Sequence, residues 1–250
     1  MYAGKKLRKW YGVEGQVLPR DGGQQGEAEP QPEEEEPAER EYIAVLDADS
    51  SPMAEQVVLQ LILKRSKIRA LVRDVGAAKS GFGPYIEAVQ GDSSDAAAVR
   101  RLLRGAKAAV CCSKLGALLP AAAAARVPHV VLLTASPAGG GLGSLFAGAE
   151  QQALGDASRE AALRASGLPH TIVQVGTLAG VPGGGSSLAL TAGGAPQGNV
   201  AREDAAVALA EAAERDAAAG SLTLQLRAAG QGDPPEDWQA AFADLLAVSG

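Results

Sequence analysis

The segment from Tyr42 to Asp92 constrains the fold more than any other part of this 250-residue chain. Tyr42–Leu46 is a continuous apolar run, as expected of a parallel strand covered on both faces. From Pro52 to Arg65 apolar residues recur at helical spacing, and Pro52 suits the first turn of a helix. Ile68–Val72 and Tyr85–Val89 predict two more strands, joined by a loop. This alternation predicts an α/β fold with a doubly wound, mostly parallel sheet of the Rossmann type.

The rest of the chain continues the alternation. The pattern predicts strands over residues 107–112, 127–134, 170–175 and 221–226, and helices over residues 95–104, 115–126, 150–166, 202–215 and 237–248. Residues 176–198 are rich in Gly and Ser and predict a long irregular loop. A glycine-rich segment at 138–148 follows the fifth strand and not the first, so we interpret it as a loop and not as a phosphate cradle.

Composition predicts one domain behind an N-terminal extension. With 46% hydrophobic residues the chain can bury one sizeable core and needs no second domain. We place the extension and its acidic linker at residues 1–41 and a Rossmann-like domain at residues 42–250. The net charge of −6 is uneven, since residues 27–41 hold eight Glu and one Arg, whereas residues 42–250 come to −2. The nearly neutral domain disfavours direct nucleic-acid binding, and no stretch reaches the length of a membrane span.

Four short segments carry a family resemblance. ALVRD at Ala70–Asp74 and VQGDSSD at Val89–Asp95 resemble the atypical short-chain dehydrogenase/reductase family, especially its NmrA-like branch. ASGLPHTIV at Ala165–Val173 and VAREDAA at Val200–Ala206 match two further family segments in the same order. The resemblance spans about residues 42–226 and implies a Rossmann fold of the NAD(P)-binding type.

The turn after the first strand departs from the family pattern. Alignment with the family helix places the three glycines of its G-x-x-G-x-x-G turn at Ala48, Ser51 and Ala54. The first glycine makes the tight turn and the second lets the backbone approach the pyrophosphate. Ser51 is also a candidate N-cap for the helix N–H groups that would hold a phosphate. Because Asp47 and Asp49 add negative charge there, we expect NADP to bind weakly or not at all.

Other positions keep part of a cofactor site. The resemblance implies that Arg73 accepts the 2′-phosphate of NADP and that Asp92 contacts the adenine. Ser113 is a further candidate cofactor residue, and overlap of Cys112 or Ser113 with the nicotinamide end is one candidate for what else closes the site. The alternatives are a solvated strand-end charge for Arg73 and a turn residue for Asp92. Arg202 is expected to begin a helix and to pair with one of the two acidic residues that follow it.

The sequence offers no catalytic residue at the family positions. Typical members use a tyrosine as the acid, with a lysine four residues later, on the helix after the fifth strand. This chain has no tyrosine after Tyr85, and its single Tyr-x-x-x-Lys match, Tyr2 and Lys6, lies in the extension. Asp156 aligns with the lysine that many NmrA-like relatives keep, and Gln174 replaces the arginine of their Arg-Pro motif. We therefore predict no proton donor for hydride transfer.

Neither the cysteines nor the histidines suggest a metal site. Cys111 and Cys112 are adjacent at the end of a predicted strand, and we interpret them as buried thiols, with a redox role as the alternative. His129 and His170 each begin a predicted strand. No ligand cluster with metal-binding spacing surrounds them.

The extension begins with a basic aromatic cluster, followed by an acidic linker with four consecutive glutamates at Glu33–Glu36. We interpret the cluster either as a disordered tail or as a peptide that docks on a protein complex with Trp10 as its anchor. The candidate partner-binding residues are Lys5, Lys6, Arg8, Lys9, Trp10 and Tyr11.

Three functions remain open at this stage. The leading hypothesis is a non-catalytic Rossmann-fold subunit that acts as a scaffold or assembly factor in a larger complex. The alternative is an NADPH-dependent oxidoreductase acting on a small carbonyl compound. Association with RNA, as in some chloroplast relatives, is disfavoured by the charge of the domain. The resemblance implies a plant or green-algal chloroplast protein, and the cytoplasm is the alternative.

Deleting residues 1–41 is predicted to shift the melting temperature by only a few degrees, because the extension lies outside the predicted core. The same deletion should abolish co-purification with a larger assembly, and Trp10→Ala should remove much of it. A pull-down from native extract, run beside thermal melts, tests both. Full recovery of partners by the truncated protein would contradict the scaffold hypothesis.

Overall fold

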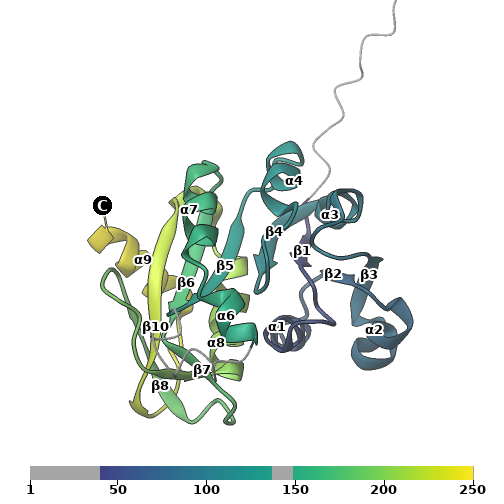
Figure 1. Cartoon of the computed structure of the whole chain (residues 1–250). Helices are drawn as coiled ribbons and strands as arrows, with labels where there is room; N and C mark the ends of the chain where they lie inside the picture. The colour runs from purple at the N-terminus through teal and green to yellow at the C-terminus, as the bar shows by residue number, and fades with distance from the viewer. Residues whose placement is uncertain (1–39, 137–148, 250) are drawn as a thin grey trace, which may run out of the picture. The chain divides into compact units, whose positions relative to one another are not determined.

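An eight-stranded sheet forms the centre of the computed structural model, which describes residues 40–136 and 149–249. The strand order is β3-β2-β1-β4-β5-β6-β10-β8, and Figure 1 shows β3 and β8 at opposite ends. All strands are parallel except β8, which pairs antiparallel with β10. The bounds are β1 Tyr42–Val45, β2 Ile68–Val72, β3 Ile86–Gln90, β4 Ala106–Cys111, β5 Val130–Ala135, β6 His170–Val175, β8 Ser186–Thr191 and β10 Leu222–Gln231.

Helices cover both faces of this sheet, so the predicted doubly wound α/β fold is confirmed. Along β1, Ile43 and Val45 belong to one apolar cluster, and Ala44 belongs to the other, because successive side chains of a strand point to opposite faces. The first cluster contains residues of α1 (Pro52–Leu63), α2 (Val75–Phe82), α6 (Ala149–Leu154), α8 (Arg202–Glu214) and α9 (Trp238–Ser249). The second contains residues of α3 (Ala96–Leu103), α4 (Leu118–Ala124) and α7 (Ala157–Ala165).

Two 3₁₀ turns lie between the helices and strands of the described chain. A 3₁₀ turn, Gly83–Tyr85, leads into β3, and a second, Ala217–Ala219, follows α8. Arg40 donates to the carbonyl of Ala125 from both terminal nitrogens at 3.1 Å, so the chain is already held against the C-terminal end of α4 two residues before β1.

Two sequence predictions about helices were wrong. The segment between β2 and β3 was predicted as a loop but contains α2, whose buried residues are only Ala78 and Phe82. Such a short, glycine-containing helix gives little periodic signal. The helix predicted over residues 150–166 is two helices, because Asp156 begins a new one by accepting a hydrogen bond from the Ser158 N–H at 2.9 Å.

The segment predicted as an irregular loop, residues 176–198, contains strands. β7 (Thr177–Ala179) pairs in parallel with β9 (Asn199–Ala201) in a separate two-stranded sheet, and β8 extends the main sheet. Gly176 permits this return of the chain, since a Cβ there would lie 2.2 Å from the carbonyl oxygen of Gly198. Among the described residues no helix is both long and apolar enough to cross a membrane.

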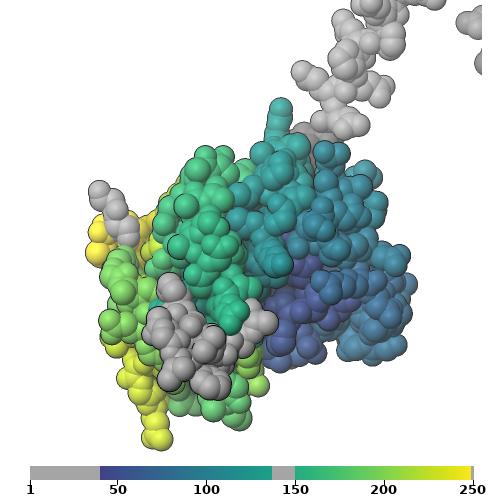
Figure 2. Space-filling view, viewed as in Figure 1, coloured from purple at the N-terminus to yellow at the C-terminus, as the bar shows by residue number. Residues whose placement is uncertain are grey.

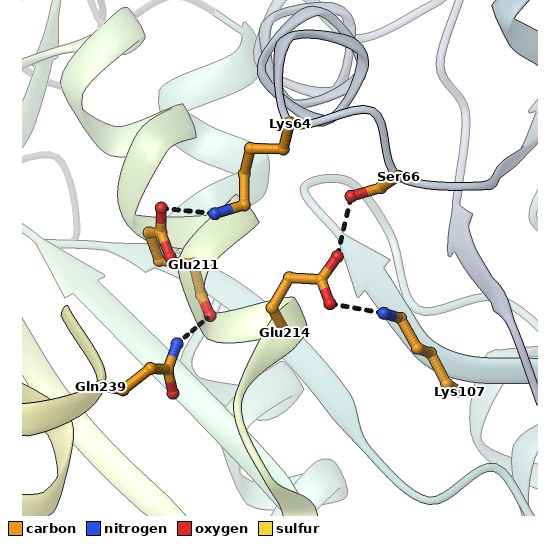
Figure 3. A network of polar contacts seen from close by, with 6 residues as sticks. All are labelled: Lys64, Ser66, Lys107, Glu211, Glu214 and Gln239. Atoms are coloured by element: carbon orange, nitrogen blue, oxygen red, sulfur yellow. Dashed lines mark hydrogen bonds and ion pairs between the residues drawn. The ribbon is translucent and has the colours of Figure 1, made fainter. Parts of the chain in front are cut away.

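A polar network ties the far ends of α1 and α8 together (Figure 3). Its members are Lys64, Ser66, Lys107, Glu211, Glu214 and Gln239. The half-buried carboxylate of Glu214 accepts a hydrogen bond from Ser66 at 2.7 Å and pairs with Lys107 on β4. Burial raises the pKa of Glu214, but the hydrogen bonds from Lys107 and Ser66 outweigh it and lower the pKa overall.

Glu214→Gln should therefore lower the free energy of unfolding at neutral pH by about 1–2 kcal/mol, because it removes charge-assisted hydrogen bonds. A folded-state pKa below the unfolded value stabilises the protein above the unfolded pKa, and this stability is lost as the pH falls through the folded pKa. The difference between wild type and variant should thus shrink in acid. Urea unfolding at several pH values measures it, with the exposed Glu236→Gln as control. Equal stability of all three proteins at pH 7 would refute this role.

Candidate functional site

A cavity of about 460 Å³ opens at the carboxyl edge of the sheet, where β1 turns into α1. In open α/β sheets, ligands bind at this edge. Figure 2 shows the purple surface of the β1–α1 segment beside the teal surface that follows β4. The polar lining comes from separate elements and includes Asp47, Arg73, Ser93, Ser113, Lys114 and Glu150.

The turn between β1 and α1 takes its special conformation at Asp47. This residue has φ 51°, in the left-handed region that favours glycine. Ala48, which the sequence alignment placed at the first glycine position, is fully buried and donates its N–H to the Leu71 carbonyl at 2.9 Å. The glycine-favouring position is thus one residue earlier than the alignment placed it, and Ala48 does not line the cavity.

The Asp47 carboxylate bridges the ends of two other strands. Its Oδ1 accepts from the Ser93 N–H at 3.0 Å, and its Oδ2 accepts from the Ser113 hydroxyl at 2.6 Å. Ser93 follows β3 and Ser113 follows β4. One buried carboxylate therefore joins the turn to the ends of both strands.

A second carboxylate, that of Asp49, holds the end of β2. Its Oδ2 accepts from the backbone N–H groups of Arg73 at 2.7 Å and Asp74 at 3.0 Å. The sequence placed the 2′-phosphate of NADP at this position. The carboxylate therefore already uses two backbone donors that an anionic group would need.

The first turn of α1 has no unused N–H group. Pro52 has none to offer, and the Ala54 N–H donates to the Ser51 hydroxyl at 3.3 Å, which confirms Ser51 as the N-cap. The Met53 N–H donates to Oε1 of Glu150 at 3.1 Å. Helix N-termini attract anions, and at this one the anion is a side chain of the protein itself.

Glu150 is held in place from its other side by Arg202. Oε2 of Glu150 accepts from Nε of Arg202 at 3.0 Å and from Nη2 at 2.8 Å. The expected local pairing of Arg202 was wrong. The acidic neighbours instead accept backbone hydrogen bonds, Glu203 from Gly183 at 2.9 Å and Asp204 from Gly184 at 2.6 Å.

The remaining predicted cofactor residues divide into two groups. Arg73 lines the cavity together with Lys114, and within the described chain the Arg73 guanidinium makes no hydrogen bond. Asp92 lies outside the cavity lining, and its carboxylate accepts from the hydroxyl and the N–H of Ser94, which lowers its pKa. The N-terminal cluster Lys5–Tyr11 and the glycine-rich segment 138–148 lie outside the described residues.

These residues do not fit the phosphates of a dinucleotide. The backbone N–H groups that a pyrophosphate or a 2′-phosphate would use after β2, after β3 and at the start of α1 bond to Asp49, Asp47, Ser51 and Glu150. Each added like charge 4 Å from a phosphate costs about 1 kcal/mol in water and about 4 kcal/mol at an effective dielectric constant of 20.

The residues at the family's catalytic positions make structural contacts in this chain. Asp156, at the lysine position, is the N-cap of α7. Gln174, at the arginine position, donates to both carboxylate oxygens of Glu160 at 2.9 Å. Neither residue can supply a proton to a substrate while it serves these contacts.

Both histidines and both cysteines are buried. His129 is buried and bonds to the Thr171 hydroxyl at 2.9 Å, and burial, with the charge of Arg215, lowers its pKa to about 3. Cys111 and Cys112 are free and buried, and burial raises the pKa of both thiols. The described part of the chain contains no group of three or more His, Cys, Asp or Glu that could hold a metal ion.

Sequence reasoning missed Glu150 and its pairing with Arg202, although it correctly placed Arg202 at the start of a helix. Glu150 follows a glycine-rich segment, and no local pattern marks it as a partner of α1, almost a hundred residues earlier. Asp47 was recognisable from the sequence. It directly follows the first predicted strand, where this fold makes a tight turn, and its backbone takes the left-handed conformation that the turn needs.

Comparison with known proteins places this geometry in context. The profile of a family described as NAD(P)H-binding matches residues 52–216, so the match begins just after the β1–α1 turn. The comparison with curated proteins gives no match.

Solved structures with this fold are numerous. A short-chain dehydrogenase/reductase from Veillonella parvula in complex with NADP has a TM-score of 0.61 at 15% identity, over 79% of this chain and 99% of that one. The anaerobillin reductase ChuY from Escherichia coli O157:H7 has a TM-score of 0.59 at 20% identity, over 75% of this chain and 97% of that one. A putative NAD-dependent epimerase/dehydratase from Bacillus halodurans has a TM-score of 0.60 at 16% identity, over 82% of this chain and 100% of that one. At these identities the likeness establishes the fold alone.

Both thiols should be unreactive in the native protein, because burial keeps them protonated and out of contact with solvent. A thiol-specific reagent at pH 8 should label neither cysteine until the protein is unfolded, and both afterwards. Ser113→Cys supplies the control, since Ser113 is half-buried, whereas Cys112, which also lines the cavity, is only 2% exposed. Rapid labelling of native wild type would favour the redox role instead.

Proposed function

Since the chain belongs to the NAD(P)H-binding family, we propose that it is a non-catalytic member whose dinucleotide cleft is closed by its own carboxylates. The observation that carries this proposal is the contact of Glu150 with the Met53 N–H at 3.1 Å. In this fold the N-terminus of the first helix is the place for the pyrophosphate. Here Glu150 supplies the negative charge that the helix dipole attracts.

The closure depends on more than one residue. A dinucleotide would have to displace Glu150 from α1 and also leave its partner Arg202 without a counter-ion. Breaking a partly buried pair costs more than the pair contributes, because one charge stays uncompensated. Asp49 would have to give up two backbone hydrogen bonds as well.

Among the described residues, the cleft also lacks the tyrosine that typical short-chain dehydrogenases use as the acid. The last tyrosine in the sequence is Tyr85, which precedes β3 and is exposed. The cysteine thiols stay protonated at neutral pH, because burial raises their pKa values. For this reason we assign the protein a binding role, as a scaffold or assembly subunit that uses surfaces away from the cleft.

One observation favours a second candidate, an NADPH-dependent reductase of a small carbonyl compound. The cavity of about 460 Å³ is large enough for part of a cofactor. Arg73 and Lys114 line it and offer positive charge to a phosphate. A related fold from Veillonella parvula is in complex with NADP. In this alternative, Glu150 and Asp49 would move aside when the cofactor enters.

Titration calorimetry with NADPH separates the two functions. The wild-type protein should bind NADPH with a Kd above about 100 μM, corresponding to less than about 5.5 kcal/mol of binding free energy. The triple variant Asp47→Gly, Asp49→Thr and Glu150→Ala should bind at least about tenfold more tightly, since it frees the donors and removes three like charges. Adding Arg73→Ala should reduce the gain and shift the preference toward NADH.

A matched control removes three charges elsewhere. Asp233→Asn, Glu236→Gln and Asp244→Asn are all exposed, and the combined variant should bind NADPH as weakly as wild type. Low-micromolar binding by the wild type would overturn the proposal and favour the reductase. No gain in the triple variant would mean that the carboxylates are not what closes the cleft.

A further inference from the structure

A second cleft lies beside β3 and has a volume of about 440 Å³. It is lined by residues 87–90 of β3 and by Arg69, Arg101 and Arg104. Figure 1 shows β3 at the opposite end of the sheet from β8. β3 is the terminal strand of the sheet, and within the described residues it pairs only with β2. Its outer edge therefore remains free of strand pairing in this part of the chain.

The lining shows how this cleft is oriented. Alternate side chains of a strand point to opposite faces of the sheet. A cleft on one face would contact every second residue, but this one contacts four consecutive residues of β3, from Glu87 to Gln90. Because Arg69 of β2 and the arginines at the end of α3 also line it, the cleft lies between α3 and the sheet and reaches the open edge of β3, where backbone groups can receive another strand.

The charged residues that line this cleft are three arginines and one glutamate, Glu87. Arg69 stacks over the Tyr42 ring at 4.2 Å, pairs with Glu87 at 2.9 Å and keeps a buried Nε without a hydrogen bond. Arg101 donates to the carbonyl of Gln90 at 3.2 Å. The Arg104 side chain is exposed and bonds to no described residue.

We propose that this cleft binds an extended acidic peptide, which adds a strand to β3 and places its carboxylates against Arg101 and Arg104. Strand addition supplies main-chain hydrogen bonds, and the flanking side chains supply selectivity. Arginine is suited to this task because its planar fork binds carboxylates in pairs of hydrogen bonds.

The ligand is an acidic peptide and not a nucleic acid for two reasons. Residues 42–250 carry a net charge of −2, so the domain as a whole does not attract a long polyanion. A strand edge also offers backbone hydrogen bonds that only another polypeptide can complete. This inference holds whether or not the dinucleotide cleft is closed.

The probe is a short fluorescent peptide of alternating Glu and Val, and fluorescence anisotropy in low-salt buffer measures its binding to the whole chain. We expect a Kd below about 100 μM, and amide NMR shifts confined to β3 and α3. The double variant Arg101→Glu and Arg104→Glu should weaken binding at least about tenfold, because like charges then face each other. Both positions are exposed, so the variant should fold.

Three controls separate the explanations. Arg227→Glu, exposed on β10, reverses one charge far from β3 and should leave binding unchanged. The same peptide methylated on alternate backbone nitrogens keeps its charges but cannot complete a ladder, and should also lose at least about tenfold. Tighter binding by a single-stranded oligonucleotide, equal binding by a Lys and Val peptide, or no binding by the acidic peptide would each overturn the proposal.

Discussion

Every backbone N–H group at the carboxyl edge of a parallel sheet needs an acceptor, and the rest of this site follows from how that need is met. In a nucleotide-binding member of the fold, the ligand supplies acceptors when it binds. Here Asp47, Asp49 and Glu150 supply them in the ligand-free protein. Buried or half-buried donors are costly to leave unpaired, so these carboxylates stabilise an edge that would otherwise depend on solvent or a ligand.

The same contacts organise distant parts of the chain. Asp47 joins the ends of β1, β3 and β4, and Glu150 joins α6 to α1 and, through Arg202, to the start of α8. At the other end of α1, Glu214 and its partners join this helix to α8 again. Helix α1 is thus fixed at both ends by side chains from segments that follow it by about 100 and 150 residues. These contacts would have to break before the cleft could open at α1.

Much of the fold could be predicted from the sequence, because continuous apolar runs mark parallel strands buried on both faces. Ile68–Val72 and His170–Val175 have the predicted bounds. The helix α2 was missed because only Ala78 and Phe82 are buried, and β7 and β8 were missed because glycine and serine hide a strand signal. At the site, the loss of the glycines in the β1–α1 turn could be predicted from the sequence. The Glu150–Arg202 pair could not, because it depends on the packing of segments that are far apart in the chain.

Amide hydrogen exchange in the ligand-free protein tests the central claim most directly, because it reports on each donor separately. The account predicts slowed exchange at the N–H groups of Met53, Arg73, Asp74 and Ser93. It also predicts that Glu150→Ala removes the protection of Met53 and leaves that of Arg73 and Asp74 unchanged. Exchange of all four amides at the rate of solvent-exposed groups in the wild-type protein would contradict it, since the carboxylates would then not be holding the donors of the cleft.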